Sequence, residues 1–346
     1  MRLFWIAVAL LTFSAQANEP TPLDYAEFDA CALASGETLA PCRIGYRTYG
    51  TLNAGQSNAV LVPTWHTGKT DAHVFLASPD VIDPERYFII MVDALANGVS
   101  SSPSNHSKTS GSSFPTITIA DMVDTQHRLL TEHLGIDSLH AVMGISMGGM
   151  QTFEWVVRYP DFADRAIAVI GSTRLPTFDI AFWTARIQTL KWFRDCDRCD
   201  DSRLAMQAMW MTALVPTKLG EEVSREQTMA TIAERAAADT LTIAESWDIQ
   251  RQAEAMNTHN VARDFDNDMT KAAARVSSDL LIIVGTDDRV VTPEPAKTFA
   301  TLTGAALIEF DKDCGHGEPG CNAAAFNEAV RLFLRDGTDR PAASAR

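Results

Sequence analysis

Short continuous runs of apolar residues recur along the chain, separated by longer stretches with helical spacing. The continuous runs lie at residues 59–62, 87–92, 139–143, 166–170, 279–284 and 305–310. Such runs predict strands that are buried on both faces, as in parallel sheets. Residues 43–49 instead alternate between apolar and polar positions, which predicts an early antiparallel strand. The pattern predicts an α/β fold around a mostly parallel sheet of about eight strands.

Strand patterns disappear between residue 175 and about residue 270, where helical periodicity takes over. We interpret this stretch as a helical lid inserted into a core formed by residues 18–174 and 271–335, followed by a flexible tail at 336–346. Large apolar side chains of the lid could pack its helices, form a dimer interface or roof an acyl pocket. They are Phe182, Trp183, Trp192, Phe193, Met206, Met209, Trp210 and Met211.

One serine stands between a predicted strand and a predicted helix. Ser146 is the central residue of G-I-S-M-G at 144–148, after the run at 139–143 and before an amphipathic stretch that ends near Tyr159. In the nucleophile elbow of α/β-hydrolases the serine occupies such a sharp strand-to-helix turn, with its hydroxyl near the helix N-terminus. This predicts Ser146 as a nucleophile and the backbone N–H of Met147 as one oxyanion donor. The alternative is a serine packed in a glycine-rich turn.

An acid and a histidine follow in the order that this chemistry needs. In α/β-hydrolases the triad runs Ser, then Asp or Glu, then His along the chain. One late predicted strand leads into Asp287 and Asp288, and the last one leads into His316 between two glycines. Asp288 fits the usual G-x-x-D-x-V spacing, and Asp287 is the alternative. We therefore predict a triad of Ser146, Asp288 and His316.

Further stretches resemble the homoserine O-acetyltransferase family of the α/β-hydrolase superfamily. They lie at 58–62 with 67–68, at 114–119, at 144–151 with 154–155 and 159–160, and at 257–263. The segment S-M-G-G-M-Q followed by E-W is far more specific than the elbow alone. The resemblance covers residues 40–335 and implies an α/β-hydrolase fold with a helical lid, an acyl-serine intermediate and a homodimer built through the lid helices.

Two positions depart from that family. Its loop after the early strand reads H-A-L-T-G, whereas residues 64–68 read T-W-H-T-G here. The backbone N–H of His66, at the family's leucine, is our candidate for the second oxyanion donor, and action of its imidazole on the substrate is the alternative. Family acetyltransferases carry an aspartate after the catalytic histidine to hold the substrate amine, where this chain has Gly317. The resemblance therefore supports acyl chemistry without supporting recognition of homoserine.

The first residues have the three parts of a secretory signal peptide. Arg2 precedes an apolar run at residues 3–13, and an A-x-A site follows at 15–17. We expect cleavage near Ala17 and a periplasmic or secreted protein. We expect no membrane anchor, because the apolar run is too short to span a bilayer.

The six cysteines form three pairs that are close in sequence. An even number of cysteines in an exported protein predicts disulfides, although six cysteines allow many connectivities. Proximity favours Cys31 with Cys42, Cys196 with Cys199, and Cys314 with Cys321. The last bridge would fix the loop that carries His316. The C-x-x-C of the second pair also fits a redox pair or half a zinc site, but no second C-x-x-C and no nearby histidine accompany it. We therefore predict no metal site.

Composition limits the class of partner. The chain has 346 residues, of which 46% are hydrophobic and 21% are charged, and this excludes a disordered protein. A net charge of −15 disfavours nucleic acid and anionic membrane surfaces. Because an exported enzyme meets water more readily than acetyl-coenzyme A, we predict a secreted serine hydrolase that cleaves a small-molecule carboxylic ester without a cofactor. The alternatives are an acyltransferase acting on a small alcohol and a non-catalytic binding protein on the same fold.

Overall fold

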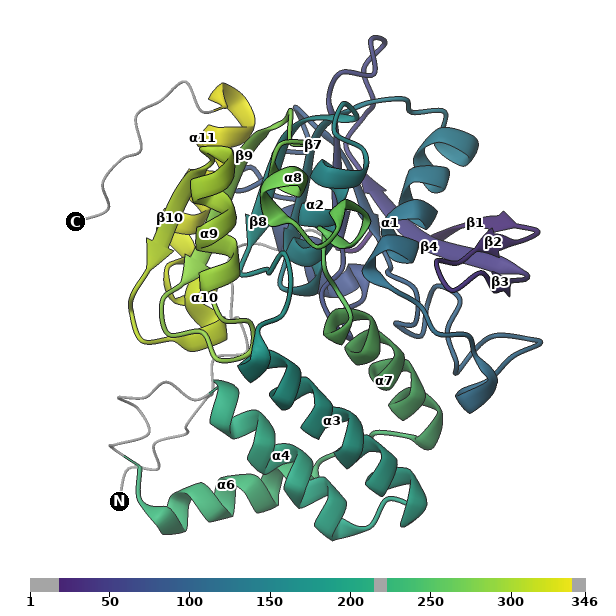
Figure 1. Ribbon diagram of the computed structural model, residues 1–346, viewed down its shortest axis with the longest axis vertical. Helices are drawn as coiled ribbons and strands as arrows, with labels where there is room; N and C mark the ends of the chain where they lie inside the picture. The colour runs from purple at the N-terminus through teal and green to yellow at the C-terminus, as the bar shows by residue number, and fades with distance from the viewer. Residues whose placement is uncertain (1–18, 215–222, 338–346) are drawn as a thin grey trace.

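The computed structural model describes residues 19–214 and 223–337, so the predicted signal peptide lies outside the described residues. An eight-stranded sheet forms the centre, in the order β1-β4-β6-β5-β7-β8-β9-β10 (Figure 1). The strands are β1 (Asp24–Phe28), β4 (Cys42–Tyr49), β5 (Ala59–Pro63), β6 (Phe88–Val92), β7 (Leu139–Ile145), β8 (Ala163–Val169), β9 (Asp279–Gly285) and β10 (Ala306–Phe310). A short hairpin, β2 (Cys31–Ala32) and β3 (Thr38–Leu39), lies apart from this sheet.

The strand directions follow from the hydrophobic pattern. The strands from β6 to β10 in the sheet order pair in parallel, and all five residues of β5 are buried. The alternating strand β4 pairs antiparallel with both β1 and β6. The predicted mostly parallel sheet is therefore confirmed. The edge strand β1 was not predicted, because Ala26 is its only fully buried residue.

Helices cover both faces of the sheet and bury two apolar clusters. On one face lie α1 (Ile119–Arg128), which continues as a π-helical turn (Leu129–Leu134), α2 (Met147–Arg158) and α9 (Glu294–Thr303). On the other face lie α11 (Ala323–Asp336) and a 3-10 segment, η1 (Thr70–Leu76). Because α11 continues to Asp336, the first residue of the predicted tail belongs to this helix. Residues 338–346 lie outside the described part of the chain.

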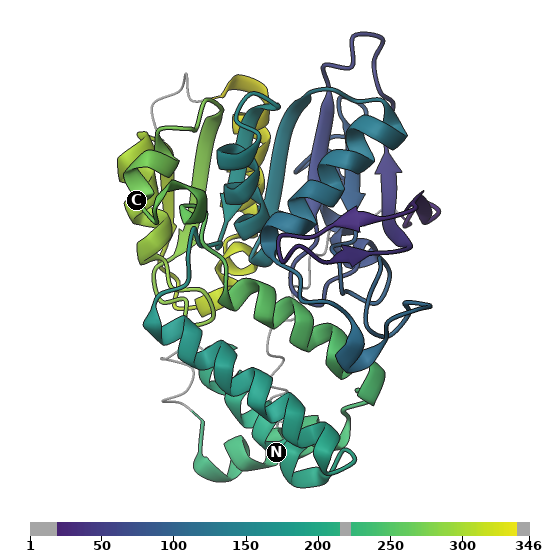
Figure 2. The same cartoon turned by 45° about the vertical axis from the view of Figure 1, so that its right-hand side comes forward.

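Among the described residues, four helices lie together at one end of the sheet, and we call them the lid. They are α3 (Thr177–Asp195), α4 (Asp200–Leu214), α6 (Arg225–Ala237) and α7 (Ile243–Asn257). Figures 1 and 2 both show this layer beneath the sheet, with α3 and α7 nearest to it. A short helix, α8 (Met269–Ala273), leads the chain back into the core. Within the described residues, no helix combines the length and apolarity that crossing a membrane requires.

Candidate active site

Ser146 occupies the tight turn between β7 and α2. Its φ of 59° lies in the left-handed region, which is a strained position for a serine. Its N–H donates to the carbonyl oxygen of Val169 at 2.8 Å, and its own carbonyl accepts from the N–H of Met150 at 3.0 Å. A Cβ at Gly144 would lie 2.1 Å from the carbonyl oxygen of Gly148. The turn therefore requires glycine at 144, and it presents the serine hydroxyl at the end of the sheet.

The structure brings the three predicted triad residues together. His316 Nε2 lies 2.8 Å from Ser146 Oγ, and His316 Nδ1 lies 2.7 Å from Asp288 Oδ2. The other carboxylate oxygen of Asp288 accepts from the backbone N–H groups of Val290 at 2.8 Å and Val291 at 3.1 Å. Both oxygens of this buried acid are thus engaged, and one of them orients the imidazole. Such an arrangement can remove the serine proton as the hydroxyl attacks a carbonyl.

Asp287, the alternative acid, contacts a different part of the histidine loop. Each of its carboxylate oxygens lies 3.2 Å from the backbone nitrogen of Gly315, whose N–H they share. Burial, followed by a hydrogen bond with the carboxyl group of Asp313, raises the pKa of Asp287. Asp288 therefore contacts the imidazole of His316, whereas Asp287 contacts the backbone beside it. Sequence spacing could not assign these two contacts with certainty, because both acids follow the same strand.

Met147 is the first residue of α2, so its N–H has no acceptor within the helix. The start of this helix lies against the end of β5, because a Cβ at Gly148 would come within 2.6 Å of the carbonyl oxygen of Pro63. The loop that follows β5 carries His66. The two elements that hold the predicted oxyanion donors, Met147 and His66, are therefore neighbours.

The backbone N–H groups on either side of His66 both have acceptors. The N–H of Trp65 donates to His73 Nε2 at 3.3 Å, and the N–H of Thr67 donates to Gln252 Oε1 at 2.7 Å. In the described part of the chain we find no such acceptor for the N–H of His66. This backbone group fits the second oxyanion donor, a role that stays a prediction.

The imidazole of His66 faces the lid. Its Nε2 lies 3.3 Å from the carbonyl oxygen of Ile249 in α7, and its ring meets Trp183 edge-on with centroids 4.9 Å apart. Burial lowers the pKa of His66 to about 3, with a further contribution from Arg186. The ring is therefore neutral at ordinary pH, and its Nε2 donates to Ile249. This engagement favours the backbone N–H over the imidazole as the functional part of His66.

A chain of buried side-chain hydrogen bonds positions the loop after β5. Trp155 Nε1 donates to Gln126 Oε1 at 2.8 Å, and Gln126 Nε2 donates to Gln151 Oε1 at 2.6 Å. Gln151 Nε2 then donates to the carbonyl oxygen of Thr64 at 3.0 Å. These contacts tie the loop to α1 and α2. The sequence segment S-M-G-G-M-Q with E-W contains Gln151 and Trp155, but the motif alone did not reveal this positioning role.

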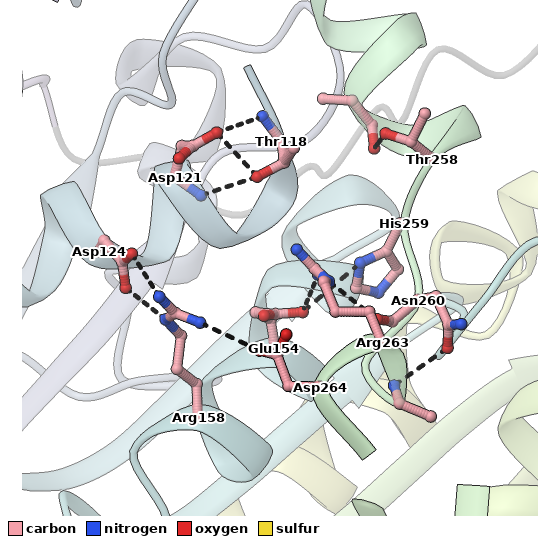
Figure 3. A network of polar contacts seen from close by, with 12 residues as sticks. Thr118, Asp121, Asp124, Glu154, Arg158, Thr258, His259, Asn260, Arg263 and Asp264 are labelled. Carbon is pink, nitrogen blue, oxygen red and sulfur yellow. Dashed lines mark hydrogen bonds and ion pairs between the residues drawn. The ribbon is translucent and has the colours of Figure 1, made fainter. Parts of the chain in front are cut away.

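A second polar network ties the elbow helix to the segment where the lid returns to the core (Figure 3). Glu154 of α2 lies 2.8 Å from Arg263 Nη2 and 3.7 Å from His259 Nδ1, both through Oε2. Burial raises the pKa of Glu154 to about 7 and lowers the pKa of His259 to about 3. In the same view Arg158 turns away from His259 and pairs with Asp124. Glu154 therefore shares its carboxylate mainly with Arg263.

The cysteines form the three bridges that proximity favoured, Cys31–Cys42, Cys196–Cys199 and Cys314–Cys321. The last bridge closes the segment that includes a 3-10 turn (Gly315–Gly317) and α10 (Glu318–Cys321). Within it, the N–H of Cys314 donates to Glu318 Oε1 at 2.9 Å. The loop that carries His316 is therefore closed by a disulfide, and the imidazole is bound by the buried Asp288. Across the described residues, no three His, Cys, Asp or Glu side chains gather as metal ligands would.

Comparison with known protein families shows the family of this chain. The family model described as the alpha/beta hydrolase fold matches residues 66–317. The chain belongs to the alpha/beta hydrolase fold family. The matched stretch contains Ser146, Asp288 and His316.

This α/β-hydrolase has both esterases and acetyltransferases among its relatives. It is 40% identical over 172 residues to an ethyl acetate hydrolase of Pseudomonas veronii, covering 49% of each chain. It is 37% identical over 177 residues to a homoserine O-acetyltransferase of Leptospira biflexa, covering 45% of this chain and 46% of the relative. The chain thus spans about half the length of the curated relatives it matches. The resemblance inferred from its motifs is confirmed.

The fold likeness extends further along the chain. The crystal structure of an acetylester hydrolase from Corynebacterium glutamicum superposes with a TM-score of 0.80 at 26% identity. The superposition covers 90% of this chain and 95% of the other. The predicted α/β-hydrolase fold with its mostly parallel sheet is therefore confirmed over nearly the whole chain.

Proposed function

We propose that this α/β-hydrolase cleaves carboxylic esters through an acyl-serine intermediate. One observation carries the proposal: Ser146 Oγ, His316 and Asp288 form a continuous hydrogen-bonded chain with distances of 2.8 Å and 2.7 Å. Esterases among the relatives, including one named for ethyl acetate, support a short acyl group.

The reaction proceeds in two steps. His316 takes the proton of Ser146 as Oγ attacks the ester carbonyl, and Asp288 stabilises the resulting imidazolium. The N–H groups of Met147 and His66 donate to the oxyanion, and losing one such donor typically lowers turnover by about 10²–10³. The imidazolium then protonates the leaving alcohol. In the second step His316 removes a proton from water, whose oxygen attacks the acyl carbon and releases the acid and free Ser146.

Water is the acceptor that we propose. Gly317 offers no carboxylate beside His316 to hold an amine, which argues against homoserine as the acceptor. Three disulfides are typical of an oxidising compartment, where acyl-coenzyme A is scarce. We therefore propose a secreted or periplasmic hydrolase whose leader is cleaved near Ala17.

We also propose a homodimer formed through the lid. Three large apolar side chains of α3 are exposed, namely Phe178 at 57%, Ile180 at 41% and Trp192 at 44%. Contiguous exposed apolar patches mark interfaces, and Phe178 and Trp192 lie on one side of α3. Light scattering of the purified protein at micromolar concentration tests this, because a mass of a single chain would contradict it.

Hydrolysis of 4-nitrophenyl acetate with and without added small alcohols tests the proposed activity. We expect free acetate to account for nearly all of the released acyl group, even with homoserine or glycerol present. O-acetyl product in excess of free acetate would support the acyltransferase instead. Folded protein that neither hydrolyses esters nor reacts with a fluorophosphonate would support the non-catalytic binding protein.

A further inference from the structure

A buried arginine of the lid faces the loops that carry the proposed active site. Arg186 is only 6% exposed, and it lies three residues after Trp183 on α3, hence on the same face of that helix. Trp183 Nε1 lies 3.3 Å from the carbonyl oxygen of Val290 and its ring contacts His66. The N–H of Val290 in turn binds Asp288. This face of α3 therefore lies over the triad acid and the oxyanion loop.

Two of the three nitrogens of the Arg186 guanidinium lack polar partners. Its Nε and Nη1 atoms are buried and have no hydrogen-bond acceptor in the described residues. The acid that acts on it electrostatically is Asp239, whose carboxylate accepts the N–H of Leu241 at 2.9 Å. Burial lowers the pKa of Arg186 to about 10, so the group still carries its charge at neutral pH. A buried charge without a partner is strongly disfavoured unless something else compensates it.

Another arginine of the same helix shows what a structural arginine looks like in this lid. Arg194 stacks on Trp247 at 3.7 Å, and its Nη1 donates to Ser246 Oγ at 3.1 Å while its Nη2 contacts Gln250. Arg186 has the aromatic contact alone, with its guanidinium carbon 5.3 Å from the ring centroid of Trp210. Packing therefore accounts for the burial of the Arg186 stem and the flat face of its guanidinium. It does not explain why the Nε and Nη1 donors have no acceptor.

An aromatic cluster that contacts this charge through Trp210 links it to His66 through Trp183. Phe182, Trp183 and Trp210 form an edge-to-face cluster with centroids 5.4–5.9 Å apart. Arg186 adds to burial in lowering the pKa of His66, which puts the guanidinium within electrostatic range of the oxyanion loop. The region combines aromatic side chains with a buried cation that has two unpaired nitrogens, and ligand sites pair apolar walls with a few such polar groups.

We propose that Arg186 forms an anion subsite that binds a carboxylate on the ester substrate. This inference rests on the proposed ester hydrolysis. Arginine is the side chain best suited to a carboxylate, because its donors match the carboxylate oxygens. Since Gly317 provides no partner for an amine, the substrate is an ester that carries a free acid and needs no ammonium group. The carboxylate belongs either to the acyl group or to the leaving alcohol.

Two pairs of substrates separate these sources. Mono-4-nitrophenyl adipate and its methyl ester differ by a charge on the acyl side, and 3-acetoxypropionate and 3-acetoxypropionamide differ by a charge on the alcohol side. The readout is the ratio of kcat/KM for the charged substrate to that for its neutral partner. We expect this ratio to exceed one in one pair and to fall by about 10- to 100-fold in Arg186→Met, as loss of a charge-assisted hydrogen bond predicts.

Arg194→Met is the matched control, because it removes an arginine from the same helix and should keep the wild-type ratio. Arg186→Lys keeps the charge and should retain part of the preference, and it carries the test should Arg186→Met fail to fold. A ratio of one or less in both pairs, or the wild-type ratio in the Arg186 variants, would overturn the subsite. Wild-type protein that hydrolyses neither the charged nor the neutral esters would instead contradict the proposed function itself.

Discussion

Asp287 and Asp288 are consecutive residues whose carboxylates hold the same loop at different atoms. Asp288 Oδ2 lies 2.7 Å from His316 Nδ1, and the oxygens of Asp287 lie 3.2 Å from the backbone nitrogen of Gly315. One acid therefore sets the tautomer of the imidazole, while the other sets the path of the backbone that carries it. Variants of these two neighbouring acids can therefore be compared directly.

Replacing each acid by its amide separates the two contacts. Asp288→Asn removes the charge that stabilises the imidazolium, and we expect kcat for 4-nitrophenyl acetate to fall by about 10⁴. Asp287→Asn keeps an amide oxygen that accepts the N–H of Gly315, so we expect a loss of about tenfold or less. Circular dichroism checks that both variants fold. A larger loss in Asp287→Asn than in Asp288→Asn would assign the triad acid to Asp287.

The bridge between Cys314 and Cys321 closes the loop around His316, so its removal should affect turnover. We expect the double variant Cys314→Ser/Cys321→Ser to lower kcat by about tenfold or more, because small displacements of a catalytic base are costly to the reaction. The control is Cys196→Ser/Cys199→Ser, which opens a shorter bridge, with a sequence separation of 3 against 7, in the lid. Equal losses in the two double variants would contradict a specific role for the loop bridge.

The buried carboxyl of Glu154 predicts a pH dependence of stability. Its pKa is about 7 in the folded protein against an ordinary value of 4.5, so the folded state binds this proton more tightly than the unfolded chain. The stability that this group contributes is therefore complete below about pH 4.5 and is lost as the pH rises to about 7. The loss amounts to at most about 3 kcal/mol.

Unfolding of the wild type and Glu154→Gln by urea at pH 5 and pH 8 measures this effect. Glutamine keeps an acceptor oxygen for Arg263 but has no proton to lose. We expect the wild type to lose stability relative to Glu154→Gln between the two pH values. Glu328→Gln, on the exposed side of α11, controls for the loss of a surface carboxylate. A wild type that gains stability relative to Glu154→Gln as the pH rises would contradict the account.

Much of the fold could be predicted because its main strands are buried on both faces. Such strands appear in the sequence as unbroken apolar runs, and the elbow adds a serine between two glycines at the end of one run. The order of the later acid and histidine then limited the triad to very few residues. The strand β1 was missed because an edge strand with one fully buried residue leaves no such pattern.

The remaining contacts depend on where side chains point, which hydrophobic patterning does not encode. Asp287 and Asp288 follow the same strand, and only the folded loop shows which one meets the imidazole. The buried chain from Trp155 to Thr64 joins residues far apart in sequence. Arg186 looks like any charged residue of an amphipathic helix until its burial and its unpaired nitrogens are seen.

The central claim is that the hydroxyl of Ser146 becomes reactive because His316 and Asp288 activate it. The most direct measurement is the intact mass of wild type and Ser146→Ala after exposure to a fluorophosphonate, together with their hydrolysis of 4-nitrophenyl acetate. We expect one covalent adduct on the wild type, none on folded Ser146→Ala, and hydrolysis reduced by at least about 10³ in the variant. A Ser146→Ala protein that still forms the adduct and hydrolyses the ester at the wild-type rate would contradict the account.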